Sequence, residues 1–134
     1  MYLVDTNVIS EARKGRKANA GVKSFFEKVN EADLYLSVQT IGEIRKGVER
    51  LKNRGDITQS QKTGAWLKLL VTEYSDRILQ FDTECAQVWG KLMAVNNNQI
   101  DMQIAAIALI HDLTVVTRNV GDFDIGIPLL NPFK

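Results

Sequence analysis

The chain has 134 residues, which is room for one domain of common size and too little for a multidomain enzyme. Its 17 Lys and Arg residues nearly balance its 16 Asp and Glu residues, so the net charge of +1 gives no simple argument for a nucleic-acid or membrane partner. A content of 45% hydrophobic and 25% charged residues excludes a disordered or fibrous protein. We therefore expect residues 1–134 to form one globular domain.

Five short apolar runs predict β-strands. Segments with apolar residues at the spacing of one helix face lie between the first four runs, and a helix cap follows the first run directly. Strands that alternate with helices indicate an α/β domain with a mainly parallel sheet of four to five strands. The predicted strands cover residues 2–4, 34–37, 78–80, 114–117 and 127–130.

Helix caps mark the starts of the predicted helices. The first helix begins at residues 5–7, and others cover residues 20–30 and 39–53. Thr58 is expected to cap the next helix, with Gln61 completing a capping box. A further helix is capped by Asp82 or Thr83, and Asp101 opens one that ends at His111 or Asp112.

Cysteine and histidine are almost absent. Cys85 is the only cysteine, which excludes an internal disulfide and a cysteine-based zinc site and is typical of the reducing cytoplasm. His111 is the only histidine, and its place after an apolar run favours a helix C-terminus over a catalytic role. The first residues lack a signal-peptide pattern, and the longest apolar run, 104–110, is far shorter than the ~20 residues of a membrane span. We expect a soluble cytoplasmic protein with no membrane contact.

Basic residues concentrate in the first half of the chain. Residues 1–62 have four more basic than acidic side chains, and residues 63–134 have three fewer. Two solvated surfaces would explain this, and so would a phosphate-binding surface beside a catalytic centre. The candidates for nucleic-acid contact are Arg13, Lys14, Arg16, Lys17, Arg45 and Lys46.

Polar and acidic residues follow two of the predicted strands. Asp5 ends the first strand, and the segment 118–122 follows the fourth. Because ligand sites in open α/β sheets lie beyond the carboxyl ends of the strands, these groups are expected at one edge. Each acid alone can also be explained as a helix cap or a turn residue.

Two more acids can reach the same edge from helices. Glu43 lies near the start of the helix after the second strand, and Asp101 lies at the mouth of a helix that is apolar nearly all round. Gly42 and Gly47, in the same helix as Glu43, suggest that something packs close to the backbone there. Clustered carboxylates without Cys or His favour Mg²⁺ or Mn²⁺ and the hydrolysis of phosphate esters.

Four segments resemble a known family when taken in order: VDTNVIS, TIGEIRKG, IDMQIAAIAL and TVVTRNVGDF. Together they resemble the PIN-domain ribonucleases, among them the VapC-type toxins of bacterial toxin–antitoxin pairs. The likeness extends from Tyr2 to the closing NPF. It implies a single PIN-like domain over residues 1–134 and a metal-dependent endoribonuclease that acts as a toxin.

The resemblance also assigns roles to the acids. Asp5, Glu43 and Asp101 match the acids of the first three motifs. Asp5 and Asp101 would hold Mg²⁺ or Mn²⁺ most directly, and Glu43 would complete the metal shell, partly through water. Thr6 matches a small hydroxyl residue that steadies the first acid.

The fourth motif departs from the family pattern. Some relatives carry an acid where this chain has Asn119, and others carry it three residues later, where this chain has Asp122. We expect Asp122 to be the fourth catalytic and metal-binding acid and Asn119 to be a polar orienting group. This departure leaves the number of bound metals open.

The resemblance further implies partners. They are an RNA substrate, a second copy of the chain, and a cognate antitoxin protein whose C-terminal segment lies across the site. A larger toxin–antitoxin assembly would bind operator DNA through the antitoxin.

Two other functions compete with this one. A phosphatase of the haloacid dehalogenase type also has an acid after its first strand, but it needs a second Asp two residues later, where this chain has Asn7. A signalling or RNA-binding module of receiver type would use the acidic pocket without cleavage, but a receiver has paired acids after its first strand and a Lys after a late strand. Here Asp5 stands alone and Arg118 follows Thr117.

Overall fold

The sheet at the centre of the protein has five strands in the order β3-β2-β1-β4-β5, and every neighbouring pair is parallel. The computed structural model describes all residues from 1 to 134. This confirms the predicted α/β class and parallel sheet, with the last three strands shorter than expected. The strands are β1 Tyr2–Val4, β2 Leu34–Ser37, β3 Ile78–Leu79, β4 Thr114–Val116 and β5 Leu129–Leu130.

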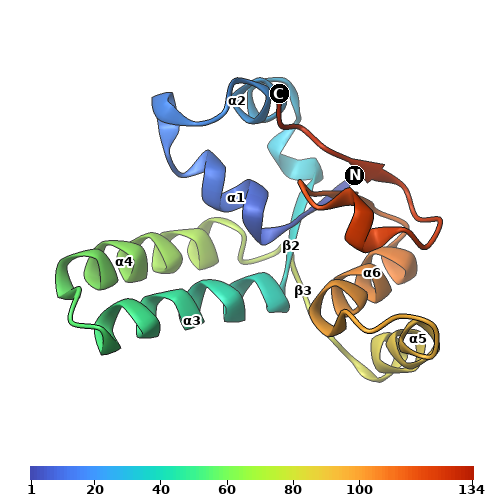
Figure 1. The fold of residues 1–134 in the computed structure, drawn as a ribbon. Coiled ribbons are helices and arrows are strands. Elements are labelled where there is room, and N and C mark those ends of the chain that lie inside the picture. Colours follow the sequence, from blue (N-terminus) through green and yellow to red (C-terminus); the bar gives the residue numbers. More distant parts are fainter.

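Six α-helices surround the sheet. In Figure 1 the long hairpin of α3 and α4 extends away from the strands, and α5 and α6 lie together on the other side. No helix combines the length and the apolar character that crossing a membrane requires. The helices are α1 Thr6–Ala12, α2 Ala20–Lys28, α3 Val38–Asn53, α4 Ile57–Glu73, α5 Thr83–Met93 and α6 Gln99–His111, with short 3-10 turns η1 Gly15–Lys17, η2 Glu31–Asp33 and η3 Val120–Phe123.

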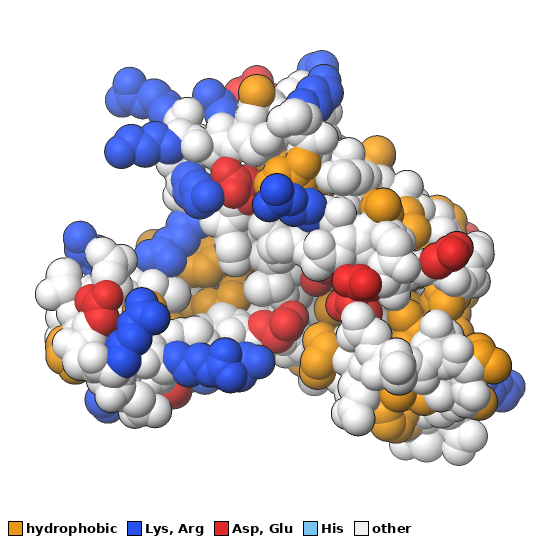
Figure 2. All heavy atoms as spheres, viewed as in Figure 1, with side chains coloured by type: hydrophobic (Ala, Val, Ile, Leu, Met, Phe, Trp, Pro, Cys, Tyr) orange, Lys and Arg blue, Asp and Glu red, His pale blue; other side chains and the backbone are white.

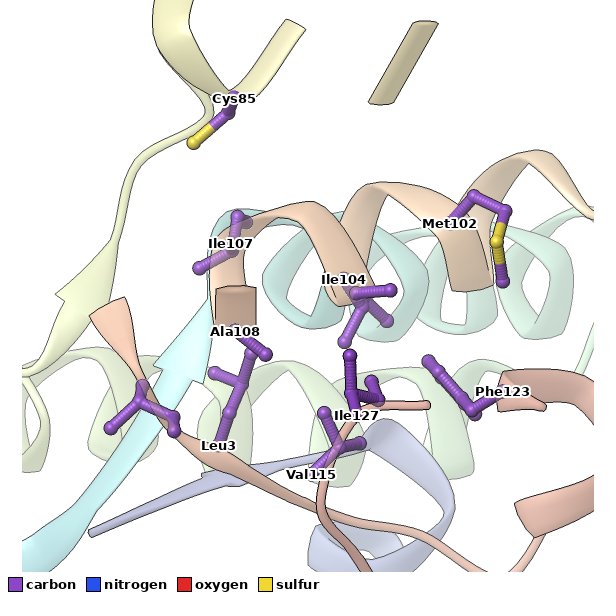
Figure 3. Packing of buried hydrophobic residues seen from close by; sticks show 11 residues of the cluster. Leu3, Cys85, Met102, Ile104, Ile107, Ala108, Val115, Phe123 and Ile127 are labelled. Atoms are coloured by element: carbon purple, nitrogen blue, oxygen red, sulfur yellow. The ribbon is translucent and has the colours of Figure 1, made fainter. Parts of the chain in front are cut away.

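The two faces of the sheet have separate cores because successive side chains of a strand point to opposite sides. Leu3 and Val115 point toward α6 and pack against Ile104, Ala108 and neighbouring residues of the same cluster (Figure 3). The adjacent residues Val4 and Val116 belong to the opposite cluster, which contains residues of α1 to α4. By the same alternation, a side chain one position beyond Val4 or Val116 faces α6.

The strand order reverses between β1 and β4. The chain passes from β1 to β2 and β3, and then returns through α5 and α6 to place β4 on the other side of β1. Ligand sites of open α/β sheets lie at such a switch point, outside the carboxyl ends of the strands. The register pairs Val4 with Val116, so the residues that follow these two leave the sheet side by side.

Two predicted helix starts were wrong by two residues. Asp56, not Thr58, caps α4, and its carboxylate accepts the N–H of Gln59. The φ of +88° at Gly55 turns the chain just before Asp56, so the helix begins earlier than the capping-box pattern indicates. Helix α6 begins at Gln99, which places Asp101 inside its first turn rather than at its cap.

The close packing expected at Gly42 and Gly47 was also wrong, since a Cβ at either position would have nothing within 4 Å. The crowded glycine is Gly21 in α2, where a Cβ would overlap the carbonyl oxygen of Pro132. Asn19 holds this contact in place, because its side chain bonds the backbone N–H and C=O of Lys134 at 3.0 and 2.8 Å. The segment 131–134 therefore lies tightly across the start of α2 (Figure 1).

We expect Gly21→Ala to lower the free energy of unfolding by about 1–3 kcal/mol, because the new methyl group overpacks against Pro132. Gly42→Ala is the matched control, since it lies within a helix but faces open space. It should raise the free energy of unfolding by up to about 1 kcal/mol through helix propensity. Urea unfolding of both variants measures the changes. A Gly21→Ala protein that is more stable than the parent would contradict the close packing of residues 131–134 against Gly21.

Candidate active site

Asp5 is the most deeply buried acid of the chain and caps α1. Only 4% of its surface is exposed. Its Oδ1 accepts the backbone N–H of Thr6 at 2.8 Å, and its Oδ2 accepts the hydroxyl of Thr117 at 2.8 Å and the amide of Asn7 at 3.3 Å. Three donors from two strand ends therefore fix the orientation of this carboxylate.

Burial raises the pKa of Asp5, and the nearby charge of Glu43 raises it further. The hydrogen bonds from Thr117, Thr6 and Asn7 act in the opposite direction because they favour the charged form. A buried carboxylate with a raised pKa is one that a cation would stabilise.

Glu43 reaches the site from α3 and is held by Thr6. The Thr6 hydroxyl donates to Glu43 Oε1 at 2.8 Å and lies 3.0 Å from the hydroxyl of Thr40. Thr40 is buried, and its N–H donates to Ser37 Oγ at the cap of α3. Thr6 thus contacts Asp5 only through its backbone, and its hydroxyl orients the second acid instead of the first.

Asp101 faces the same edge from the first turn of α6. Its Oδ2 accepts the side-chain amide of Asn98 at 2.6 Å. Burial and then the charges of Asp5, Asp122 and Glu43 raise the pKa of Asp101 to about 6. The acids of the four motifs therefore lie within electrostatic reach of one position.

Asp122 and Asn119 lie in and just before η3, after β4. Asp122 is exposed, and its charge is one of those that act on Asp101. The side chain of Asn119 makes no hydrogen bond with the protein, but its backbone N–H donates to Thr117 Oγ1 at 3.0 Å. Asn119 thus supports Thr117 through its backbone, and Asp122 supplies the fourth charge.

The donor set suits a hard divalent cation, because every polar group that points into the site presents oxygen or a neutral amide. No three of the acids lie close enough to hold one ion together. Burial is the main cause of the raised pKa of both Asp5 and Asp101, so these two acids are shielded from solvent.

The six predicted basic residues are all exposed. Arg13 stacks on Trp66, with 4.9 Å from the guanidinium carbon to the ring centroid, and donates to Thr63 Oγ1 at 3.1 Å. Lys14 pairs with Glu11 at 2.8 Å and Arg45 with Glu49 at 3.7 Å. Arg16, Lys17 and Lys46 are exposed and form no ion pair. Figure 2 shows Lys and Arg side chains on both sides of a hollow with acidic side chains near its inner end.

A cavity of about 360 Å³ lies between α1, α2 and α4. Its apolar lining includes Ile9, Leu34 and Trp66, and Arg13 lies on its wall. On the other side Glu31 raises the pKa of Glu73 by hydrogen bonding to its carboxyl group. The cavity is thus apolar inside, with a basic side chain, Arg13, and two acidic side chains, Glu31 and Glu73, at its rim.

Four residues that hold the acids were missed in the sequence. Asn7, Thr117 and Asn98 bond an acid directly, and Thr40 acts through Thr6. Thr117 could have been found, because the parallel register that brings Val116 beside Val4 also brings Thr117 beside Asp5. Thr40 could have been found from its position three residues before Glu43 on the same helix face. Asn7 had no such signal, since its sequence position suggests only a turn or a cap.

Comparisons with known proteins agree with one another. The family model described as PIN domain matches residues 2–124. The chain is 33% identical to the plasmid stability protein StbB of Pseudomonas syringae pv. tomato, over all of this chain and 99% of that protein. It is 34% identical to toxin FitB of Neisseria gonorrhoeae, over 92% of this chain and 91% of FitB. The crystal structure of FitAcB from Neisseria gonorrhoeae superposes with a TM-score of 0.85 and 31% identity, covering 98% of each chain.

The raised pKa of Asp101 predicts a pH effect on the stability of the metal-free protein. Between its unfolded value near 3.8 and its folded value of about 6, the folded chain binds more protons, so stability falls as pH rises through this range. Asp101→Asn removes this loss and should stabilise the protein above pH 6 by about 1 kcal/mol after allowance for solvent screening. The gain should vanish below pH 4, near the unfolded value.

Chemical unfolding in EDTA at a series of pH values measures this difference. Glu84→Gln is the matched control, because Glu84 also lies in the first turn of a helix but belongs to exposed α5. It should give no gain above pH 6. An Asp101→Asn protein that is no more stable than the parent in alkaline buffer would show that the acids do not repel one another.

Proposed function

The chain belongs to the PIN-domain family, and we propose that it is a Mg²⁺- or Mn²⁺-dependent endoribonuclease that acts as the toxin of a toxin–antitoxin pair. One observation carries this proposal: the fold brings Asp5, Glu43, Asp101 and Asp122 from four separate segments of the chain to one edge of the sheet, close enough for the other three charges to act on Asp101. A divalent cation would stabilise such a cluster, because its charge offsets the repulsion between the carboxylates.

The acids would share the work of holding the metal. Asp5 and Asp101 would contact it, and Glu43 and Asp122 would complete its surroundings, partly through water. When bound, the divalent cation supplies Lewis-acid activation of water and neutralises charge during phosphodiester hydrolysis.

The remaining contacts keep these acids oriented. Thr117 and Asn7 hold Asp5 Oδ2, Thr6 holds Glu43, and Asn98 holds Asp101. None of these holding groups is itself an acid, so each acid keeps its charge for the substrate side of the site. Basic residues at the rim, including Arg13 and Lys46, would attract the phosphate backbone without reading its sequence.

The competing functions have weaker support. The position that a haloacid-dehalogenase phosphatase needs for its second Asp is Asn7, and the Asn7 amide is occupied with Asp5 and Thr117. A receiver-type module would need a Lys after β4, where Arg118 stands. RNA cleavage therefore fits the acidic site and the family of the chain better than either of these functions.

Asp5→Asn should reduce RNA cleavage by at least about a hundredfold, because it removes the buried charge that would hold the metal. Asp122→Asn should reduce it by a smaller factor, because Asp122 is exposed. The assay follows cleavage of mixed-sequence single-stranded RNA by purified protein with Mg²⁺ or Mn²⁺, and EDTA should abolish it.

Asp124→Asn is the matched control for Asp122→Asn. Both are exposed acids beside η3, but only Asp122 acts on Asp101. The Asp124 variant should retain the parent rate. Undiminished cleavage by both Asp5→Asn and Asp101→Asn would refute the assignment of the site.

We also propose that the protein forms a homodimer and is inhibited by a small antitoxin protein, which would link the complex to operator DNA. The cavity between α1, α2 and α4 suits an apolar antitoxin segment, since it is lined mostly by apolar residues. The acids Glu31 and Glu73 at its rim would pair with a basic residue of that segment.

Ala12→Trp should weaken antitoxin binding by at least about tenfold, because the indole ring would fill the cavity that Ala12 lines. The probe is the product of a small gene beside this one, co-expressed and measured by calorimetry. Ala86→Trp on exposed α5 is the control and should bind as the parent does. Equal binding by the two variants would place the antitoxin elsewhere, and light scattering of the free protein would test the dimer.

A further inference from the structure

Arg118 is fixed beside the acidic site although it is exposed. It follows Thr117, whose hydroxyl donates to Asp5 Oδ2, and its own backbone N–H donates to Asn7 Oδ1 at 3.1 Å. The Asn7 amide in turn lies 3.3 Å from the same Asp5 oxygen. The backbone of Arg118 therefore cannot shift without disturbing the donors that hold Asp5.

The guanidinium of Arg118 is held as well, but by an aromatic ring and not by an acid. Its central carbon lies 4.8 Å from the centroid of the Phe133 ring. None of the three ion pairs of the protein includes Arg118, and none of its side-chain N–H groups donates to another residue. A planar group with five N–H donors thus stands in a set position with no ligand of its own.

Glu11, whose carboxylate feels the charge of Arg118, does not pair with it. Glu11 accepts the ammonium of Lys14 and the backbone N–H of Asn19, both at 2.8 Å. These two contacts are the main cause of the lowered pKa of Glu11, and Arg118 adds only a weaker attraction. The charge of Arg118 is available to a ligand from solution.

Phe133 owes its own position to the segment 131–134. The backbone of Lys134 is clamped by Asn19, and the N–H of Phe133 donates to Asn131 Oδ1 at 3.0 Å. The ring also packs against the apolar cluster on the α1 to α4 side of the sheet. The last residues of the chain therefore determine where the Arg118 guanidinium lies.

We propose that Arg118, positioned by Phe133, binds a backbone phosphate of the RNA strand beside the phosphodiester that is cut. This inference rests on the proposed function. A polyanion that approaches four acids needs a cation at the rim of the site, and a guanidinium matches the paired oxygens of a phosphate in shape and charge. Arg118 is a substrate-positioning residue in this account, and Phe133 positions it.

The test measures the affinity of a short fluorescent single-stranded RNA of mixed sequence by anisotropy. All variants carry Asp5→Asn so that the probe stays intact. Arg118→Ala should raise the Kd by about tenfold and reduce the slope of log Kd against log salt concentration by about 0.7, the value for one lost phosphate contact on a single strand. Arg118→Lys should restore the slope and only part of the affinity.

Lys91→Ala is the control for charge, because it removes one exposed cation from α5. It should change neither the Kd nor the slope by a measurable amount. An Arg118→Ala protein that binds RNA as the Lys91→Ala protein does would overturn the proposal.

The role of Phe133 is tested by a double-mutant cycle. Phe133→Leu keeps an apolar side chain but removes the ring, and it should raise the Kd by about threefold when Arg118 is present. The same change should have no effect in the Arg118→Ala background, whereas equal effects in both backgrounds would show that Phe133 does not act through Arg118.

Cleavage by the chain with Asp5 intact separates this inference from the proposed function. If that chain cuts RNA with Mg²⁺ or Mn²⁺ and Arg118→Ala leaves both the KM and the RNA affinity unchanged, this inference fails and the function stands. If it cuts no RNA but Arg118→Ala still weakens binding with the lower salt slope, the function fails and the phosphate contact stands.

Discussion

The hydrogen bond from Thr117 to Asp5 ties the sheet and the site together. A carboxylate that is 4% exposed needs donors on both oxygens, and one of them is the hydroxyl at the end of β4. That hydroxyl is in place only if β4 pairs with β1 in the observed register. The buried Asp5 carboxylate therefore has its full set of hydrogen bonds only when β4 lies beside β1 in this register. The backbone of Arg118 and the turn that carries Asp122 follow from it.

Neighbouring neutral side chains orient the acids of the site. Asp5, Glu43 and Asp101 each have neutral donors, such as Thr6 on Glu43 and Asn98 on Asp101. Thr6, Asn7 and Asn98 lie at helix starts, where N–H dipoles also favour negative charge. The arrangement orients the acids before any ligand arrives, at a cost in stability that the raised pKa of Asp101 records. A divalent cation would relieve this repulsion if the protein acts as proposed.

The sequence allowed the strands, the parallel sheet and the acidic edge to be predicted, because apolar runs and strand-end acids are local signals. Helix starts were less predictable, since Asp56 and Thr58 are both good caps and the turn at Gly55 decided between them. The predicted close packing at Gly42 and Gly47 failed for another reason. Helix glycines indicate either close packing or tolerance, and only the fold shows that Gly21 is crowded and Gly42 is not. Phe133 and Arg118 lie 15 residues apart in the sequence, and no periodicity connects them.

The return of the chain from β3 to β4 also sets the order in which the site is completed. The hydrogen bond between Asp5 and Thr117 spans 112 residues, and the segment that positions Arg118 comes later still. Contacts this distant form only after nearly all of the chain is available. During synthesis Asp5 leaves the ribosome long before its partner strand exists. The acids of the nascent chain therefore stay unassembled until synthesis is almost finished.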